Sequence, residues 1–225
     1  MKILKPALLA LWLALPAGAE TLNDVLNRMD QASSQFKAVT GNIRQLSHTD
    51  VVNEDDVATG TISMKRVKAH DVRMLINLTQ PDPKMVSLQE KSLSIYLPKI
   101  ATVQNYDVGK NRSLLEQFLL LGFGATRAEL EAAYEIHWIG EETVNGVKTG
   151  HMELTPKSPE VLHRVKKIGL WLSESTGYPA QHKIFMPGND YWLVNFSNLK
   201  LNPNLPDTAL KLKLPKGVKQ EYPQR

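Results

Sequence analysis

The sequence contains no cysteine among its 225 residues. A chain without cysteine has no disulfide framework, no thiol nucleophile and no thiolate metal site. It also has no block of lysine or arginine, and its formal net charge is only +4. Two of these charges, on Lys2 and Lys5, lie in a segment that we expect to be removed. The small charge and its even spread argue against a nucleic-acid-binding protein.

The usual sequence signatures of catalysis are missing as well. None of the six histidines shows HxH or HExxH spacing, and the chain has no G-x-S-x-G elbow. The adjacent carboxylates Asp55 and Asp56, like Glu141 and Glu142, should point apart and are typical of solvated surface charge. We therefore predict that the protein is not an enzyme and that it holds no metal and no cofactor.

The N-terminus has the pattern of a cleavable secretory signal. Lys2 and Lys5 precede an apolar run, Ala7 to Leu15, and Ala17-Gly18-Ala19 supplies an A-x-A cleavage site. We predict a signal peptide over residues 1–19, a mature protein in the periplasm, and one domain over residues 20–225. An uncleaved membrane anchor is the alternative, although the apolar run is short for a bilayer.

Most of the mature chain has the period-two alternation of β-strands. Ile62 and Met64 alternate with polar residues, and Val72, Met74 and Ile76 continue the pattern in the next segment. We count roughly eleven strands separated by turns, with hairpins at 145–146 and 187–190, a loop at 48–57 and a last strand at 210–214. This spacing predicts an α+β fold built on a large antiparallel sheet that closes toward a barrel or a sandwich.

Helical patterns occur at the start and in the middle of this series. Residues 21–37 form an amphipathic helix with a capping box at Thr21, and a short helix starts at Thr126. Between them, residues 113–124 form a very apolar helix, which we expect to begin with a capping box of Ser113 and Glu116. A helix so apolar must be covered on most sides. It is either an ordinary core helix or a removable cover over an apolar cavity.

Arg66 falls on the same strand face as Ile62 and Met64. A charge on an apolar face must be paired or hydrogen-bonded, because burial without a partner costs several kcal/mol. The alternative is an arginine at a strand end that reaches solvent along its own stem.

Several short motifs occur in an order that resembles a known family. They are an opening amphipathic helix, Gly60 to Arg66 (Gly-x-x-x-x-Lys-Arg), Gln80-Pro81-Asp82, Leu154 to Lys157 (Leu-Thr-Pro-Lys), and Leu214 to Val218. Together they resemble the periplasmic outer-membrane lipoprotein carrier family (LolA-like) over nearly the whole mature chain. The chain departs from the family pattern at Val67, where the family usually has proline, and in its aromatic-poor strand at residues 72–76.

The resemblance implies an open, incomplete antiparallel β-barrel with helices that form a lid over an apolar cavity. A family member takes lipoprotein acyl chains from an inner-membrane lipoprotein-releasing transporter and delivers them to an outer-membrane receptor, with only transient contacts near the membranes. It implies Arg66 as the latch of the lid, and we expect a monomer. The residues expected to line the cavity are Ile62, Met64, Val72, Met74, Ile76, Ile95, Leu114, Leu115, Phe118, Leu119 and Phe123.

Two other functions remain open from the sequence. The first is a carrier or sensor of another lipid or glycolipid of the cell envelope on the same fold. The second, weaker alternative is a lipid-acting hydrolase whose site has no recognisable motif.

Overall fold

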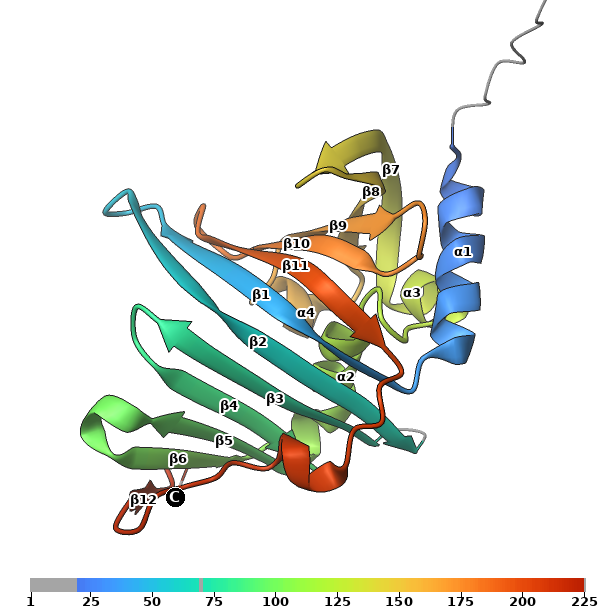
Figure 1. The fold of residues 1–225 in the computed structure, drawn as a ribbon. Coiled ribbons are helices and arrows are strands. Elements are labelled where there is room, and N and C mark those ends of the chain that lie inside the picture. The colour runs from blue at the N-terminus through green and yellow to red at the C-terminus, as the bar shows by residue number, and fades with distance from the viewer. Residues whose placement is uncertain (1–19, 69–70, 225) are drawn as a thin grey trace, which may run out of the picture.

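The computed structural model describes residues 20–68 and 71–224 (Figure 1). The predicted signal peptide, residues 1–19, lies outside the described residues. Within them the α-helices are α1 (Leu22–Gln35), α2 (Arg112–Leu120), α3 (Arg127–Ala133) and α4 (Pro159–Leu162). The strands are β1 (Ala38–Thr49), β2 (Glu54–Lys68), β3 (Asp71–Gln80), β4 (Lys84–Gln89), β5 (Ser92–Leu97), β6 (Thr102–Asp107), β7 (Tyr134–Val144), β8 (Val147–Pro156), β9 (Lys167–Ser173), β10 (Pro179–Phe185), β11 (Tyr191–Leu201) and β12 (Lys219–Glu221). Among these residues, no helix has the length and apolar character needed to cross a bilayer.

All the described strands belong to one sheet, in the order β12-β6-β5-β4-β3-β2-β1-β11-β10-β9-β8-β7. Every neighbouring pair is antiparallel except β12 and β6, which run parallel. The two edge strands, β12 and β7, do not pair with each other, so the sheet is strongly curved but open (Figure 1). The predicted α+β fold with an open antiparallel sheet is confirmed, with twelve strands rather than roughly eleven.

Two of the predicted boundaries are wrong. The predicted loop at 48–57 is mostly strand, because β1 and β2 pair as far as Thr49 and Glu54. Main-chain hydrogen bonds continue a hairpin through polar residues that show no apolar pattern. The predicted last strand at 210–214 is not formed. Leu210 ends a short 3-10 helix and is fully buried, and the last described strand is β12 instead.

One face of the sheet is apolar along nearly its whole width. The cross-strand pairs Val39–Met64, Met64–Met74 and Met74–Leu88 continue from strand to strand on this inner face. A first cluster of buried residues covers β1 to β4, and a second covers β8 to β10. Because side chains alternate along a strand, this register brings the predicted core residues of distant segments onto one face.

Helix α1 closes the second cluster. Thr21 and Asp24 form the predicted capping box, and Val25, Leu26 and Met29 are buried against β8 to β10. At the other end of α1, the hydroxyl of Tyr178 donates to the carbonyl of Ala32 at 2.9 Å. The helix is therefore fixed at both ends, by its own cap and by the sheet.

Gly60, in the Gly-x-x-x-x-Lys-Arg motif, marks a close approach of β2 to β3. A Cβ atom there would overlap the carbonyl group of Asn77 and lie 2.8 Å from the Cα of Leu78. We predict that Gly60→Ala lowers the free energy of unfolding by about 1–3 kcal/mol, because main-chain atoms would have to shift. Urea unfolding measures the change.

The matched control is Gly109→Ala. The nearest atoms to a Cβ at Gly109 are side-chain atoms of Asp107 at 3.1 Å and of Lys91 at 3.3 Å, which can move. Equal destabilisation by the two variants would contradict the close-approach argument.

Candidate functional site

The segment formed by α2 and residues 121–124 lies across the inner face and joins the two clusters; we call it the cover segment. Leu115, Leu119 and Leu120 pack against the first cluster, and Phe118 packs against the second. Beyond the helix, Leu121 is buried in the second cluster and Phe123 in the first. Removing this segment would therefore expose apolar surface on both halves of the sheet.

The structure brings most of the predicted cavity residues together in the first cluster. These are Ile62, Met64, Val72, Met74, Ile76, Leu115, Leu119 and Phe123, while Phe118 lies against the second cluster. Ile95 and Leu114 are half-buried and belong to neither cluster of described residues. Leu115 and Leu119, which we expect to fill the mouth of the cavity in the cargo-free state, pack against the first cluster.

The start of α2 differs from the prediction. Asn111 is the N-cap residue and makes no side-chain capping bond, so the predicted capping box of Ser113 and Glu116 is wrong. The side chain of Ser113 lies outside what the structure describes. Gly122 follows the helix with φ +73°, as a helix stop requires.

Arg66 holds the end of the cover segment. The cross-strand pair Arg66–Val72 lies on the inner face, and the guanidinium Nη2 of Arg66 donates to the carbonyl of Gly124 at 2.5 Å. The hydroxyl of Ser33 in α1 donates to the same carbonyl at 2.8 Å. The guanidinium also lies over the ring of Phe36, 5.5 Å from its centroid. One carbonyl of the cover segment thus joins α1, β2 and the segment itself.

A second polar contact holds α2 to β3. The main-chain N–H of Val72 donates to Glu116 at 3.2 Å, and Arg112 donates to the main-chain carbonyl of Val72. Arg112 and Glu116 also pair with each other at 2.9 Å, four residues apart on the helix. β3 pairs with β4 only from Leu78 to Met74, so the main chain of Val72 has no partner in β4. The side chains of Glu116 and Arg112 supply its hydrogen bonds instead.

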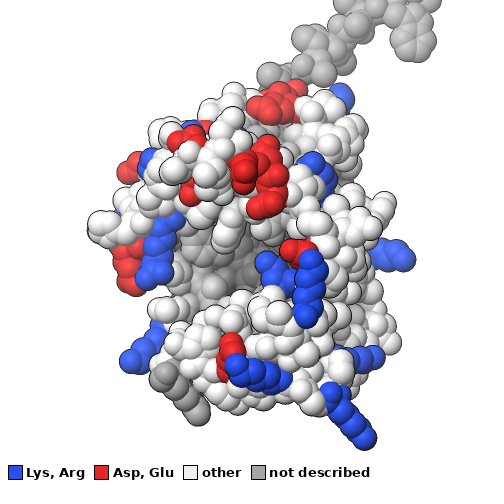
Figure 2. Space-filling model, turned by 90° about the vertical axis from the view of Figure 1, so that its left-hand side faces the viewer, with Lys and Arg blue, Asp and Glu red and all other residues white. Residues whose placement is uncertain are grey.

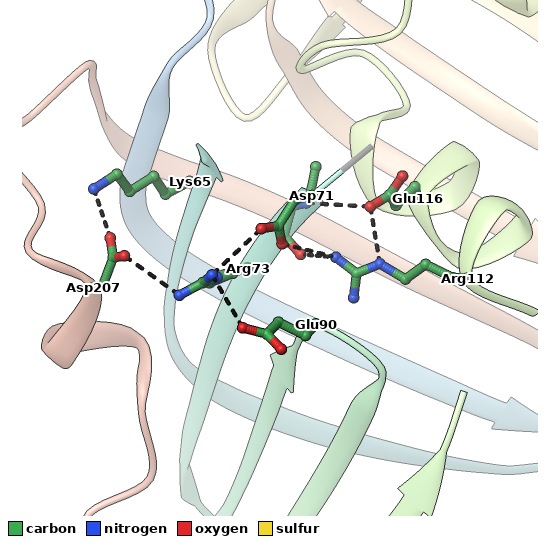
Figure 3. A network of polar contacts seen from close by, with 8 residues as sticks. Lys65, Asp71, Arg73, Glu90, Arg112, Glu116 and Asp207 are labelled. Atoms are coloured by element: carbon green, nitrogen blue, oxygen red, sulfur yellow. Dashed lines mark hydrogen bonds and ion pairs between the residues drawn. The ribbon is translucent and has the colours of Figure 1, made fainter. Parts of the chain in front are cut away.

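The contact of Glu116 and Arg112 with β3 is part of a longer chain of side chains with alternating charge (Figure 3). It joins α2 to β3, β2 and the C-terminal segment through Glu116, Arg112, Asp71, Arg73, Asp207 and Lys65. The nitrogen–oxygen distances range from 2.7 Å for Lys65 and Asp207 to 3.6 Å for Arg112 and Asp71. Arg112, Glu116 and Asp71 are largely buried, so removal of one charge would leave its partner poorly solvated.

A cavity of about 400 Å³ lies between α2 and α3, and the end of β2 at Arg66 and the start of β3 at Val72 also line it. Apolar side chains make up much of its wall: Val72, Leu120, Leu121, Ala125, Leu130 and Ala133. The polar groups in the wall are Arg66, Glu116, Gln117, Thr126, Glu129 and Tyr134. Burial raises the pKa of Tyr134 to about 12, so its hydroxyl stays protonated at neutral pH. Of the predicted site residues, only Arg66 and Val72 line this cavity.

Figure 2 shows a second hollow, at the end of the sheet where the β1–β2, β3–β4 and β5–β6 turns lie. Charged side chains of both signs surround it. Along β2, Met64 and Ile62 are buried, whereas Ala58, nearer this end, is only half-buried. The apolar inner face is therefore accessible at this end, beyond the part covered by α2.

His182 of β10 is buried beneath the cover segment. Its ring lies 6.5 Å from that of Phe123 and 5.0 Å from that of Phe196, both edge-on. Burial lowers the pKa of His182 to about 4, although a hydrogen bond with the main chain of Leu121 acts in the opposite direction. The imidazole is therefore neutral at pH 7 in the folded protein. Among the described residues, no group of three or more histidine, aspartate or glutamate side chains could hold a metal ion.

The sequence revealed Arg66 but not its partners. No sequence pattern marks the carbonyl of Gly124, the hydroxyl of Ser33 or the main chain of Val72. Each of these groups meets its partner only because the fold brings distant segments together. Glu116 did have a signal, as the one charged residue within the apolar run 114–121.

Solved structures share this fold, among them one of MucB and one of a protein from Thermus thermophilus. A crystal structure of MucB aligns with a TM-score of 0.53 at 18% identity, over 89% of this chain and 64% of that one. This chain thus spans less than two thirds of the MucB chain. An uncharacterized conserved protein from Thermus thermophilus aligns with a TM-score of 0.56 at 10% identity, over 89% of this chain and 98% of that one. No protein-family model and no curated protein sequence matches the chain.

A LolA superfamily protein from Nitrosomonas europaea also aligns, at 13% identity over 86% of this chain and 99% of that one. The TM-score of this alignment is 0.41. The open sheet with helices across its inner face, which is the fold expected of a LolA-like protein, is confirmed by the described residues themselves.

We predict that Glu116→Ala loosens α2. The variant removes the acceptor for the N–H of Val72 and leaves Arg112 without its helix partner. Hydrogen bonds to charged groups contribute about 1.5–3 kcal/mol, so amide exchange in residues 114–120 should accelerate about tenfold or more. Hydrogen exchange measured by NMR tests this, with the exposed neighbour Gln117→Ala as the control. Unchanged exchange in Glu116→Ala would mean that apolar packing alone holds the helix.

We predict that His182 makes the fold less stable in acid. In the unfolded chain its pKa is about 6.5, against about 4 when folded. Between these values the unfolded chain binds more protons, so stability is lost as pH falls through this window, by at most about 1.4 kcal/mol per pH unit. Urea unfolding at pH 6.5 and 5.0 should therefore show a smaller loss in His182→Gln than in the wild type.

The control for this measurement is His137→Gln, which changes an exposed histidine of β7. It should keep the wild-type dependence on pH. If His182→Gln kept it too, the buried imidazole would not be the group responsible.

Proposed function

We propose that this chain is a carrier of the bacterial cell envelope that binds the acyl chains of lipoproteins on the inner face of its sheet. The observation that carries the proposal is the cover segment. It fills an apolar, open-sided sheet, and polar contacts hold it at two places, Arg66 with Gly124 and Val72 with Glu116 and Arg112. An acyl chain could replace its leucines on the same surface.

Magnitudes support such an exchange. Each CH₂ group moved out of water contributes ~0.8 kcal/mol, and a fully buried leucine contributes about 1.5–3 kcal/mol. A long acyl chain therefore matches the contacts of several leucines. Because the two occupants are similar in free energy, the polar contacts decide which one is favoured. The closed, filled inner face of this structure is the cargo-free state in the proposal.

The cellular setting of the proposal rests on the sequence. The signal peptide predicted over residues 1–19 would export the chain as the single domain of residues 20–225 to the periplasm. There it would receive lipoproteins from an inner-membrane releasing transporter and deliver them to an outer-membrane receptor. The proposed role of Arg66 is a latch that favours the closed state and so drives release.

We predict that Arg66→Leu retains cargo. Loss of the hydrogen bond to Gly124 destabilises the closed state, so the closed state competes less well with the bound acyl chains. The added leucine keeps the inner face apolar. The variant and the wild type are loaded with a diacylglyceryl-modified peptide, and transfer to acceptor vesicles is followed by mass spectrometry. The wild type should release the peptide, and Arg66→Leu should release it at least about tenfold more slowly.

Arg44→Leu is the matched control, because Arg44 is an exposed arginine on the neighbouring strand β1. It should release cargo like the wild type. Normal release by Arg66→Leu would rule out the latch, and failure of the wild type to bind the peptide would rule out the carrier function.

A further inference from the structure

The cavity between α2 and α3 has an unbalanced set of charges. Of its carboxylates, Glu116 is buried and already bonded to Arg112 and to the N–H of Val72. Glu129 is exposed at the rim, where it accepts hydrogen bonds from the main chain and side chain of Thr126 at 2.8 and 2.9 Å. Glu116 is therefore already paired, and Glu129 holds its charge at the exposed rim.

Arg66 is the positive group that lines the same cavity. No carboxylate of the described residues lies within ion-pair distance of its guanidinium, which is half-buried. Its hydrogen bond goes to a neutral acceptor, the carbonyl of Gly124. A guanidinium matches the geometry of a carboxylate or a phosphate, which it often binds through two parallel hydrogen bonds. The position therefore favours an anion.

The rest of the cavity suits a hydrocarbon chain. Leu120, Leu121, Leu130 and Ala133 form apolar wall on both helices, and the Tyr134 hydroxyl adds no negative charge. The volume of about 400 Å³ lies within the range of roughly 300–1,000 Å³ that is typical of small-molecule sites. The charge and the wall together match an amphiphile.

We propose that this cavity binds an amphiphile with one acyl chain and an anionic head group, a carboxylate or a phosphate, which pairs with Arg66. The inference rests on the proposed function in that the ligand is an acyl compound. It adds the charge of the head group and a location, between α2, α3, the end of β2 at Arg66 and the start of β3 at Val72.

Such a ligand would also act on the cover segment. Only Nη2 of the Arg66 guanidinium bonds to the Gly124 carbonyl, and an anion that took this N–H group in a bidentate pair would displace the carbonyl. Binding in the cavity therefore weakens the contact that holds residues 121–124 against β2. The ligand favours the open state to the extent that it binds that state more tightly.

The experiment compares ligands that share one chain and differ in the head group. Dodecanoate, dodecyl phosphate, dodecanol and dodecyltrimethylammonium are titrated as monomers into the mature protein at fixed ionic strength, by calorimetry. We expect one or both of the anions to bind at least about tenfold more tightly than dodecanol, and the cation to bind most weakly. The ratio of dodecanoate to dodecyl phosphate tells a carboxylate site from a phosphate site.

Two variants and a control locate the site. In Arg66→Gln the advantage of the anions over dodecanol should disappear, while dodecanol binding stays within about threefold of the wild type and so shows that the cavity is intact. Ala133→Phe fills the cavity and should weaken the anions about tenfold or more. Arg44→Gln removes an exposed charge outside the cavity wall and should change neither.

The outcomes separate this inference from the carrier function. If dodecanol bound as tightly as the anions, or if Arg66→Gln kept the anion preference, the inference would be overturned and the carrier function would stand. Tighter binding of the cation would overturn it as well. If none of the four compounds bound, this inference would be overturned, whereas the carrier function would fail only if the wild type also failed to bind the diacylglyceryl-modified peptide.

Discussion

The structure depends on one constraint: a sheet with a continuous apolar inner face that does not close on itself. Because β7 and β12 remain unpaired edges, the sheet cannot cover this face as a closed barrel would. Helices must do so, and α1 covers one half while the cover segment joins both. The placement of Leu115, Leu119 and Phe123 follows from this need, as does the access to the inner face at the far end (Figure 2).

Apolar packing explains why the cover lies where it does, but not why it would stay there in the presence of a lipid. Leucines and acyl chains bury similar surface, so packing alone discriminates weakly between them. Directional contacts can discriminate. Arg66 needs a carbonyl at the position of Gly124, and the main chain of Val72 needs both Glu116 and Arg112. A lipid chain supplies neither, so these contacts favour the closed arrangement specifically.

Local signals explain how much of the fold the sequence predicted. The capping box at Thr21, the helix start at Thr126 and the hairpin at 145–146 depend on residues three or fewer positions apart, and all three are formed. The predicted box at Ser113 failed because the carboxylate of Glu116 bonds to a distant strand instead. The strand predicted from the alternation of Leu210, Leu212 and Leu214 is not formed. Leu210 is instead buried at the end of a 3-10 helix. A local sequence pattern does not reveal a tertiary contact that competes with the predicted local one.

The candidate site consists of Arg66, which the sequence predicted, and the cavity beside it, which the sequence did not predict. Arg66 was predictable because a charge on an apolar strand face is anomalous wherever the chain folds. The cavity beside it was not, because its wall combines α2, α3 and the start of β7, whose mutual packing no spacing encodes. Arg66 borders both the filled inner face and this cavity, and its one described acceptor is a neutral carbonyl. An anion that took the Nη2 group of this arginine would displace the Gly124 carbonyl. In our proposal, binding of such an anion and closure of the cover segment are therefore thermodynamically linked.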